Sequence, residues 1–265
     1  MTTALGWIPA ALDELRDRDL LRALVHCEGA PGPEVIIDGV GHLLLASNNY
    51  LGLASDPRVA AGARAAIDDY GAGAGASRLV DEAHATGVLG PTGAGALEHF
   101  GLEGMVPIVM GTLSKALGAQ GGYVAGSEEL CDYLRTRARA FVFTTALAPA
   151  AAGAALAALD IVRDEPERRE RIRTLARRLS EGAAELGYRV LPTDSAVVPV
   201  VIGESAEALA VAAALRRRRV WAPAIRPPSV PEGTARLRLT VMATHSDHHL
   251  DWALRALAAA RDATS

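Results

Sequence analysis

Short apolar runs bounded by glycine alternate with helical segments along this chain, and no other feature constrains its fold as strongly. The runs Arg78–Glu82, Pro107–Thr112 and Gly122–Ala125 have the length and flanks of strands buried in a parallel or mixed sheet. Towards the C-terminus we expect strands at 197–202 and 236–242 and helices at 206–219 and 247–260. This order of elements predicts an α/β fold.

The N-terminal part adds elements of a second kind. Glu34–Asp38 and His42–Ala46 flank Gly39-Val40-Gly41, which predicts a hairpin. Further helices are expected at 10–25, from Asp56-Pro57 to about 70, and at 128–140, 148–163 and 166–186. We expect residues 1–46 and 151–265 to form a small α+β domain from both chain ends, and residues 47–150 to form a truncated large domain.

Composition narrows the class of protein. A chain of 265 residues, half of them hydrophobic, can bury a sizeable core. Two cysteines are too few for a disulfide framework, so we expect a reducing, cytoplasmic location. No run approaches the roughly 18 apolar residues of a membrane span, and a net charge of −4 argues against nucleic acid or an anionic membrane as a partner.

One lysine, Lys115, stands among 27 basic residues, and the other 26 are arginine. Arginine can replace a surface lysine, but it does not lose its proton to become a nucleophile. Lys115 follows an apolar run in Gly111-Thr-Leu-Ser-Lys-Ala-Leu-Gly118, where Thr112 could contact a phosphate. Ligands of open α/β sheets bind at the carboxyl ends of strands, so the position suits a reactive amine. A compositional drift from lysine to arginine is the alternative reading.

A second candidate follows the run that ends in Asp81-Glu-Ala-His84. A carboxylate at a strand end beside a lysine-bearing strand suits pyridoxal 5′-phosphate (PLP), because Asp81 could keep the pyridine nitrogen protonated. His84 could hydrogen-bond the ring hydroxyl. The alternative for the same residues is an N-cap aspartate and a surface histidine.

Other motifs point less clearly to a site. Arg226 lies between prolines in Ile225-Arg-Pro-Pro-Ser229, so its guanidinium could hold a carboxylate or be an ordinary surface group. Gly71–Ala76 can be matched to a dinucleotide fingerprint, but it follows an expected helix, so a nicotinamide-dependent enzyme is a poor alternative. The histidines at 42, 248 and 249 lack companions for a metal site, and we expect no metal.

Several motifs together resemble the α-oxoamine synthases. They are Asn48-Asn-Tyr-Leu-Gly-Leu53, Gly71-Ala-Gly-Ala-Gly-Ala-Ser-Arg78, the segments 81–90 and 111–118, and Ala224-Ile-Arg-Pro-Pro-Ser-Val-Pro231. These are fold-type-I PLP enzymes that condense an amino acid with an acyl-CoA and release carbon dioxide. The segment around Arg226 favours the biotin-pathway member, which joins alanine to a pimeloyl thioester of CoA or of acyl-carrier protein.

The resemblance implies a role for each matching residue. Lys115 would form the internal aldimine, Asp81 would pair with the pyridine nitrogen and His84 with the ring oxygen. Thr112 and Thr145 would contact phosphate, the latter in a partner subunit, since family members are homodimers. The substrate-binding residues would be Arg226 for the carboxylate, with Arg22 and Ser229 along the acyl path.

This chain departs from the family at one place. The Gly-rich segment ending at Arg78 and the segment starting at Asp81 are far apart in family members, but here only Leu79-Val80 separates them. The missing part, several βα units of about 30 residues each, would carry a phosphate loop and the histidine that stacks on the cofactor. We therefore expect an incomplete large-domain sheet. The alternative to an active acyltransferase is an impaired relative that folds poorly or only with a full-length partner.

Overall fold

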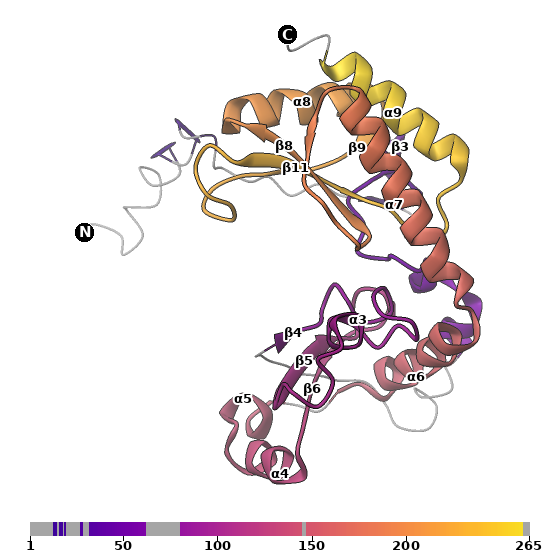
Figure 1. The fold of residues 1–265 in the computed structure, drawn as a ribbon, viewed down its shortest axis with the longest axis vertical. Helices are drawn as coiled ribbons and strands as arrows, with labels where there is room; N and C mark the ends of the chain where they lie inside the picture. Colours follow the sequence, from indigo (N-terminus) through magenta and orange to yellow (C-terminus); the bar gives the residue numbers. More distant parts are fainter. Residues whose placement is uncertain are drawn as a thin grey trace.

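The computed structural model describes residues 32–61, 80–144 and 147–261, together with positions 13, 14, 16, 17, 19, 27 and 28. Its elements form two groups, with β8, β11, α7, α8 and α9 in the upper part of Figure 1 and β4–β6 with α3–α6 in the lower part. The helices are α3 (Ala96–Phe100), α4 (Glu128–Arg137), α5 (Arg139–Val142), α6 (Pro149–Asp164), α7 (Glu167–Glu185), α8 (Ser205–Arg217) and α9 (Asp247–Arg261), with a 3₁₀ turn η1 (Leu53–Ser55). The strands are β1 (Cys27–Glu28), β2 (Glu34–Ile37), β3 (Val40–Leu44), β4 (Val80–Asp81), β5 (Ile108–Thr112), β6 (Gly122–Gly126), β7 (Arg189–Val190), β8 (Val197–Gly203), β9 (Val220–Trp221), β10 (Ala224–Ile225) and β11 (Ala235–Thr240).

Two four-stranded sheets lie in the upper group. One has the order β10-β11-β8-β7 with antiparallel neighbours, and the other has the order β1-β2-β3-β9. The expected hairpin is present as β2 and β3, but its turn is at Asp38 and Gly39, which have φ values of 51° and 73°. Val40 and Gly41, expected in the turn, begin β3 instead. Strand β3 pairs in parallel with β9, so a segment from the first fifth of the chain joins one from the last fifth.

The three long C-terminal helices cover the antiparallel sheet, as Figure 1 shows. Apolar side chains recur along one face of α7, which buries Ile172, Leu175, Leu179 and Ala183. This spacing is the helical period that the sequence shows, and the predicted helices at 166–186, 206–219 and 247–260 are confirmed to within two residues. The other positions of α7 are rich in arginine and glutamate and are mostly exposed or half-buried, whereas Arg169 is 3% exposed.

The lower group contains a mixed sheet with the order β4-β5-β6. Strand β4 is parallel to β5, with Asp81 opposite Met110, and β5 is antiparallel to β6. The predicted strands are present, and β5 and β6 match their expected ranges to within one residue. The expected helix 128–140 is interrupted at Ala138, whose ψ of 102° ends α4 before α5 begins.

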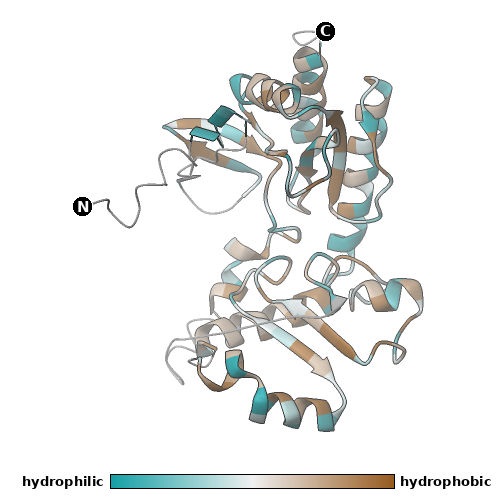
Figure 2. Cartoon of the chain, turned by 90° about the vertical axis from the view of Figure 1, so that its left-hand side faces the viewer, coloured by the Kyte–Doolittle hydropathy of each residue, from teal (hydrophilic) through white to brown (hydrophobic). Residues whose placement is uncertain are grey.

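One cluster of buried side chains connects both groups of elements. It joins Leu51 and Leu53 of the loop after β3 to Leu117, to Ile161 of α6 and to Leu237 of β11. Apolar residues also line the strands of the lower group (Figure 2). Large apolar side chains that face solvent include Phe100, Met105, Phe141, Phe143 and Leu156, all between 63% and 74% exposed. Within the described residues, no helix has the length and apolar character needed to cross a membrane.

Candidate active site at the ends of β4 and β5

Lys115 lies in a tight loop directly after β5. The amide of Gly118 donates to the carbonyl of Lys115 at 3.0 Å, and the amide of Leu113 donates to the carbonyl of Gly121 at 2.9 Å. The next two side chains, Ala116 and Leu117, are 3% and 1% exposed. The loop is therefore anchored in the core on both sides of Lys115, whose own side chain is half-buried.

Asp81 ends β4, the strand parallel to β5, so its carboxylate and the lysine loop leave the sheet at the same edge. Its Oδ1 accepts a hydrogen bond from the amide of Ala83 at 2.8 Å, while the side chain faces solvent. The following residue, Glu82, is 1% exposed and accepts from the amides of Ala96 and Leu97 at 2.6 and 2.9 Å. Glu82 thus fixes the backbone beside Asp81 by binding the start of α3.

His84 belongs to a polar cluster with residues from two other parts of the chain. Its Nδ1 lies 2.5 Å from the hydroxyl of Tyr50 and 3.3 Å from Nη2 of Arg238. The same Nη2 donates to Oδ1 of Asn48 at 3.1 Å and lies 3.3 Å from the Tyr50 hydroxyl. Because Arg238 belongs to β11, this cluster connects the antiparallel sheet to the strand ends that carry Asp81 and Lys115.

The charged groups that act on His84 include two other candidate residues, Lys115 and Asp81. The side chain of His84 is partly open to solvent, but its pKa is lowered to about 4, chiefly by desolvation and then by the positive charges of Arg238 and Lys115, while Asp81 opposes the shift. Burial likewise raises the pKa of Tyr50, against the opposing effect of Arg238. At neutral pH, His84 is therefore an uncharged imidazole between a cationic and an anionic neighbour.

Thr112 is the last residue of β5, and its hydroxyl is engaged within the loop. It donates to the carbonyl of Gly121 at 3.0 Å and lies 2.6 Å from the hydroxyl of Ser114. The amide of Ser114 donates to the same Thr112 oxygen at 3.1 Å. A phosphate would have to displace one of these contacts to reach Thr112, whereas Ser114 is already exposed.

Four predicted site residues remain, and the structure describes two of them, Arg226 and Ser229. Arg226 follows β10, is 9% exposed and has a backbone carbonyl that accepts from the amide of Ser229 at 3.0 Å. The peptide bond between its two following prolines is cis, and the Ser229 side chain faces solvent. Arg22, Thr145 and the segment Gly71–Ala76 lie outside the described residues.

The sequence reasoning missed Arg238 and gave no role to Tyr50. Strand β11 reads Ala-Arg-Leu-Arg-Leu-Thr, and its leucines are buried while Arg236 and Arg238 are half-buried on the opposite face. That alternation places both arginines on one face, but it does not show which of them reaches His84. Tyr50 is a loop residue with 0% exposure, and the sequence gives no signal of the polar groups that its buried hydroxyl contacts.

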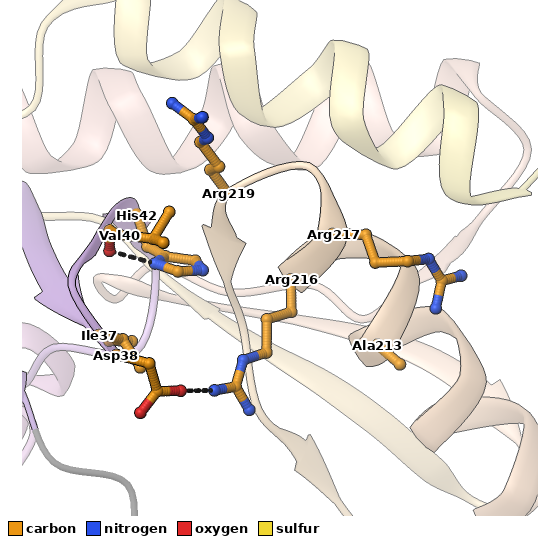
Figure 3. A pocket seen from close by; sticks show the side chains of 8 residues that line it. All are labelled: Ile37, Asp38, Val40, His42, Ala213, Arg216, Arg217 and Arg219. Carbon is orange, nitrogen blue, oxygen red and sulfur yellow. Dashed lines mark hydrogen bonds and ion pairs between the residues drawn. The ribbon is translucent and has the colours of Figure 1, made fainter.

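A separate cavity of about 480 Å³ lies between the β2–β3 hairpin and the end of α8. Figure 3 shows that the guanidinium groups around the cavity do not point to a common centre. Arg216 forms an ion pair with Asp38, and Arg217 and Arg219 point in other directions. The cavity is lined by Ile37, Asp38, Val40, His42, Ala213, Arg216, Arg217 and Arg219, none of which belongs to the lysine site. We therefore place the chemistry at the ends of β4 and β5.

The residues at these strand ends fit PLP in part. Lys115 offers an amine, Asp81 an accessible carboxylate for a ring nitrogen, and His84 an uncharged imidazole for a ring oxygen. The exposed hydroxyl of Ser114 could donate to a phosphate if it gave up its 2.6 Å contact to the hydroxyl oxygen of Thr112. A ring fixed through these groups can stabilise negative charge on a bound amino acid.

Comparison with known proteins finds relatives that match most of this chain. The family model described as "Aminotransferase class I and II" matches residues 73–257. An 8-amino-7-oxononanoate synthase of Anaeromyxobacter dehalogenans strain 2CP-C is 54% identical over 184 residues, which are 69% of this chain and 46% of that protein. In that alignment the chain spans about half the length of its relative.

The 8-amino-7-oxononanoate synthase of Anaeromyxobacter dehalogenans strain 2CP-1 aligns over a longer range. It is 35% identical over 380 alignment positions, which cover 97% of this chain and 96% of that protein. Because this chain has only 265 residues, more than a hundred alignment positions have no counterpart in it. The prediction that an internal segment is missing is thereby confirmed, and its location between Arg78 and Asp81 stays a prediction.

A solved structure supports the fold. A variant of the serine palmitoyltransferase from S. paucimobilis, solved with a bound PLP–myriocin aldimine, matches with a TM-score of 0.87 and 22% identity. The match covers 100% of this chain and 99% of that one. The expected architecture, an α/β fold of the fold-type-I class, is confirmed.

Proposed function

The chain belongs to the class I and II aminotransferase family and is homologous to 8-amino-7-oxononanoate synthases, and from this premise we propose that it is a PLP-dependent acyltransferase. In the proposed reaction, the α-carbon of L-alanine forms a bond to the carbonyl carbon of a pimeloyl thioester. The thiol leaves, the carboxyl group of alanine leaves as carbon dioxide, and the product is 8-amino-7-oxononanoate.

One observation carries this proposal: a half-buried lysine, the only one in the sequence, and an exposed aspartate leave adjacent parallel strands at the same edge, beside an uncharged histidine. Parallel neighbours place their carboxyl ends together, so the arrangement follows from β4 pairing with β5. A compositional drift from lysine to arginine would not by itself explain why the one remaining lysine lies in this loop.

The residues divide the chemistry among themselves. When bound, PLP supplies an electron-withdrawing ring that stabilises negative charge next to the substrate amine. Asp81 would hold a proton on the ring nitrogen, and His84 would donate to the ring oxygen. Lys115 would hold the cofactor and accept the α-proton of alanine. Thr112 and Thr145 stay predicted phosphate contacts.

A cation is also needed for the amino-acid carboxylate. The sequence assigns this role to Arg226, and the structure adds Arg238, whose Nη2 lies between Asn48 and His84. A guanidinium held by neighbouring acceptors is well suited to a carboxylate. We propose Arg238 as a carboxylate ligand together with Arg226, and Arg22 and Ser229 stay assigned to the acyl path. Homodimer assembly remains part of the proposal.

The single lysine makes the cofactor step easy to test. PLP is added to the purified chain, the bond between its aldehyde and an amine is reduced with borohydride, and peptides are analysed by mass spectrometry. We expect the added mass at Lys115 and no lysine adduct in Lys115→Arg, which keeps the charge but cannot condense with the aldehyde. Release of labelled carbon dioxide from carboxyl-labelled alanine, dependent on pimeloyl-CoA, tests turnover. A chain that gains no adduct at Lys115 would refute the proposal.

A second candidate function rests on the three-stranded sheet of the lower group and its exposed apolar side chains. A sheet shortened in this way exposes strand edges and apolar faces that invite association. This candidate is a catalytically impaired relative that requires a full-length partner to fold. Size exclusion and thermal unfolding of the purified chain distinguish the two. A stable, PLP-binding homodimer that releases carbon dioxide excludes the second candidate, and aggregation that a full-length relative prevents supports it.

A further inference from the structure

Nδ1 of His84 faces two groups, and the proposed chemistry gives a role to only one of them, Arg238. The Tyr50 hydroxyl lies 2.5 Å away and Nη2 of Arg238 lies 3.3 Å away. Tyr50 is completely buried, although its hydroxyl is polar and its ring could be replaced by phenylalanine without loss of volume. The role of the Tyr50 hydroxyl therefore lies in its hydrogen bonds to neighbouring groups.

The proton positions follow from the donors and acceptors of this cluster. A guanidinium has only donors, so the nitrogen that faces Arg238 must offer a lone pair. Oδ1 of Asn48 already accepts a hydrogen bond from Nη2 of Arg238 at 3.1 Å. The Tyr50 hydroxyl lies 3.1 Å from this oxygen but only 2.5 Å from Nδ1 of His84. The single hydroxyl proton of Tyr50 is thus best placed on the line to Nδ1.

An uncharged imidazole carries one proton, so an acceptor at Nδ1 requires the proton at Nε2. The charged and titratable groups that face His84 are Arg238, Lys115, Asp81 and Tyr50, and the ring is uncharged at neutral pH. Nε2 makes no hydrogen bond to any residue within the described part of the chain, so its N–H is available to a ligand.

We propose that Tyr50 is a positioning residue that, together with Arg238, fixes His84 in the tautomer with its proton on Nε2. The inference deepens the proposed function, on which it rests, because that function needs His84 to donate to the ring oxygen of PLP. A fixed tautomer presents this donor permanently, whereas a ring free to exchange would present a lone pair for part of the time. Tyr50 acts through His84 and does not itself contact the cofactor.

Nitrogen-15 NMR of the cofactor-free full chain tests the inference directly. Long-range proton–nitrogen spectra distinguish a protonated from an unprotonated ring nitrogen, and a His84→Gln variant assigns the signals. At pH 7 we expect Nδ1 unprotonated and Nε2 protonated. A proton on Nδ1 in the unmodified chain overturns the proposal, and this measurement needs no substitution at a buried position.

Tyr50→Phe then tests the role of the hydroxyl. A donor at Nδ1 stabilises the uncharged ring, so removal of the Tyr50 hydroxyl should raise the lowered pKa of His84 and shift the Nδ1 signal. Tyr188→Phe is the matched control, because that hydroxyl donates to the carbonyl of Leu257, away from His84, and should leave the signals unchanged. A Tyr50→Phe spectrum identical to that of the unmodified chain overturns the proposal. Absence of the PLP adduct at Lys115 with the Nε2 tautomer intact would instead refute the proposed function alone.

Discussion

Replacing Gly118 by alanine should displace the lysine loop, and the structure gives the size of the effect. Gly118 has a φ of +62°, and a Cβ added there would lie 2.8 Å from the backbone nitrogen of Ala54 and 2.9 Å from its Cα. Real Cβ atoms essentially never approach other atoms below 3.0 Å. The neighbour is backbone, whose amide is already bound to Oδ1 of Asn49 at 3.0 Å, so it cannot turn aside as a side chain would.

Two costs add in this variant. A left-handed backbone costs alanine about 1–2 kcal/mol relative to glycine, and overpacking a well-packed region costs about 1–3 kcal/mol. Gly118→Ala should therefore lower the free energy of unfolding by roughly 2–5 kcal/mol. Gly39→Ala is the matched control, because Gly39 has a φ of +73° and no atom lies within 4 Å of its added Cβ. It should cost only the conformational part, about 1–2 kcal/mol.

Urea unfolding followed by circular dichroism measures both variants. The rate at which PLP reacts with Lys115 gives a second readout, since the carbonyl of Lys115 accepts the amide hydrogen of Gly118. We expect slower reaction in Gly118→Ala and an unchanged rate in Gly39→Ala. Equal losses of stability in the two variants would show that the close approach to Ala54 has no energetic weight, and the reasoning would fail.

Two further predictions concern buried groups. His245 is 2% exposed, and burial lowers its pKa to about 4, below the value of 6.5 expected in the unfolded chain. At pH values between about 4 and 6.5, unfolding is therefore accompanied by uptake of a proton at His245. Stability should fall as pH drops through that window, by up to roughly 3 kcal/mol, and His245→Gln should flatten the loss of urea midpoint between pH 7 and 4.5. Glu82→Gln should lower stability by about 1–3 kcal/mol, because the single oxygen of the amide cannot replace both carboxylate oxygens that accept from Ala96 and Leu97. Thermal unfolding should show a smaller effect for Glu98→Gln, because Glu98 is only half-buried.

The fold could be predicted where the period of hydrophobicity is long enough to be seen. Helix α7, with its buried stripe, and strands β5 and β6, with glycines at their ends, lie close to their expected ranges. The two-residue strands β7, β9 and β10 were missed, because two residues carry no period. The parallel pairing of β3 with β9 joins segments almost 180 residues apart, and the chain's local pattern says nothing of such a contact.

The sequence predicts which strand ends carry the candidate residues, but it predicts only part of the contacts that these residues make. Placing Asp81 and Lys115 together needs only two neighbouring strand ends, which the apolar runs before each residue indicate. The contacts of His84 needed three-dimensional information, since they depend on how β11 lies across the strand ends. A strand with two arginines on one face leaves the choice between Arg236 and Arg238 open until that packing is known.

The way Asp81 is held explains why part of this site can persist in a shortened chain. Asp81 is positioned by β5, through the pairing with Met110 and a 2.8 Å hydrogen bond from the amide of Glu82 to the Met110 carbonyl. Glu82 in turn anchors the residues that follow it. All of these supports lie after Asp81 in the sequence, so the missing segment, predicted to precede it, is not needed for them. The family resemblance predicts that the segment would also have supplied a phosphate loop and a stacking ring, and these groups do not depend on the supports of Asp81. Binding of the cofactor aldehyde at Lys115 and complete turnover are therefore separable properties, and the adduct should form even in a chain that releases no carbon dioxide.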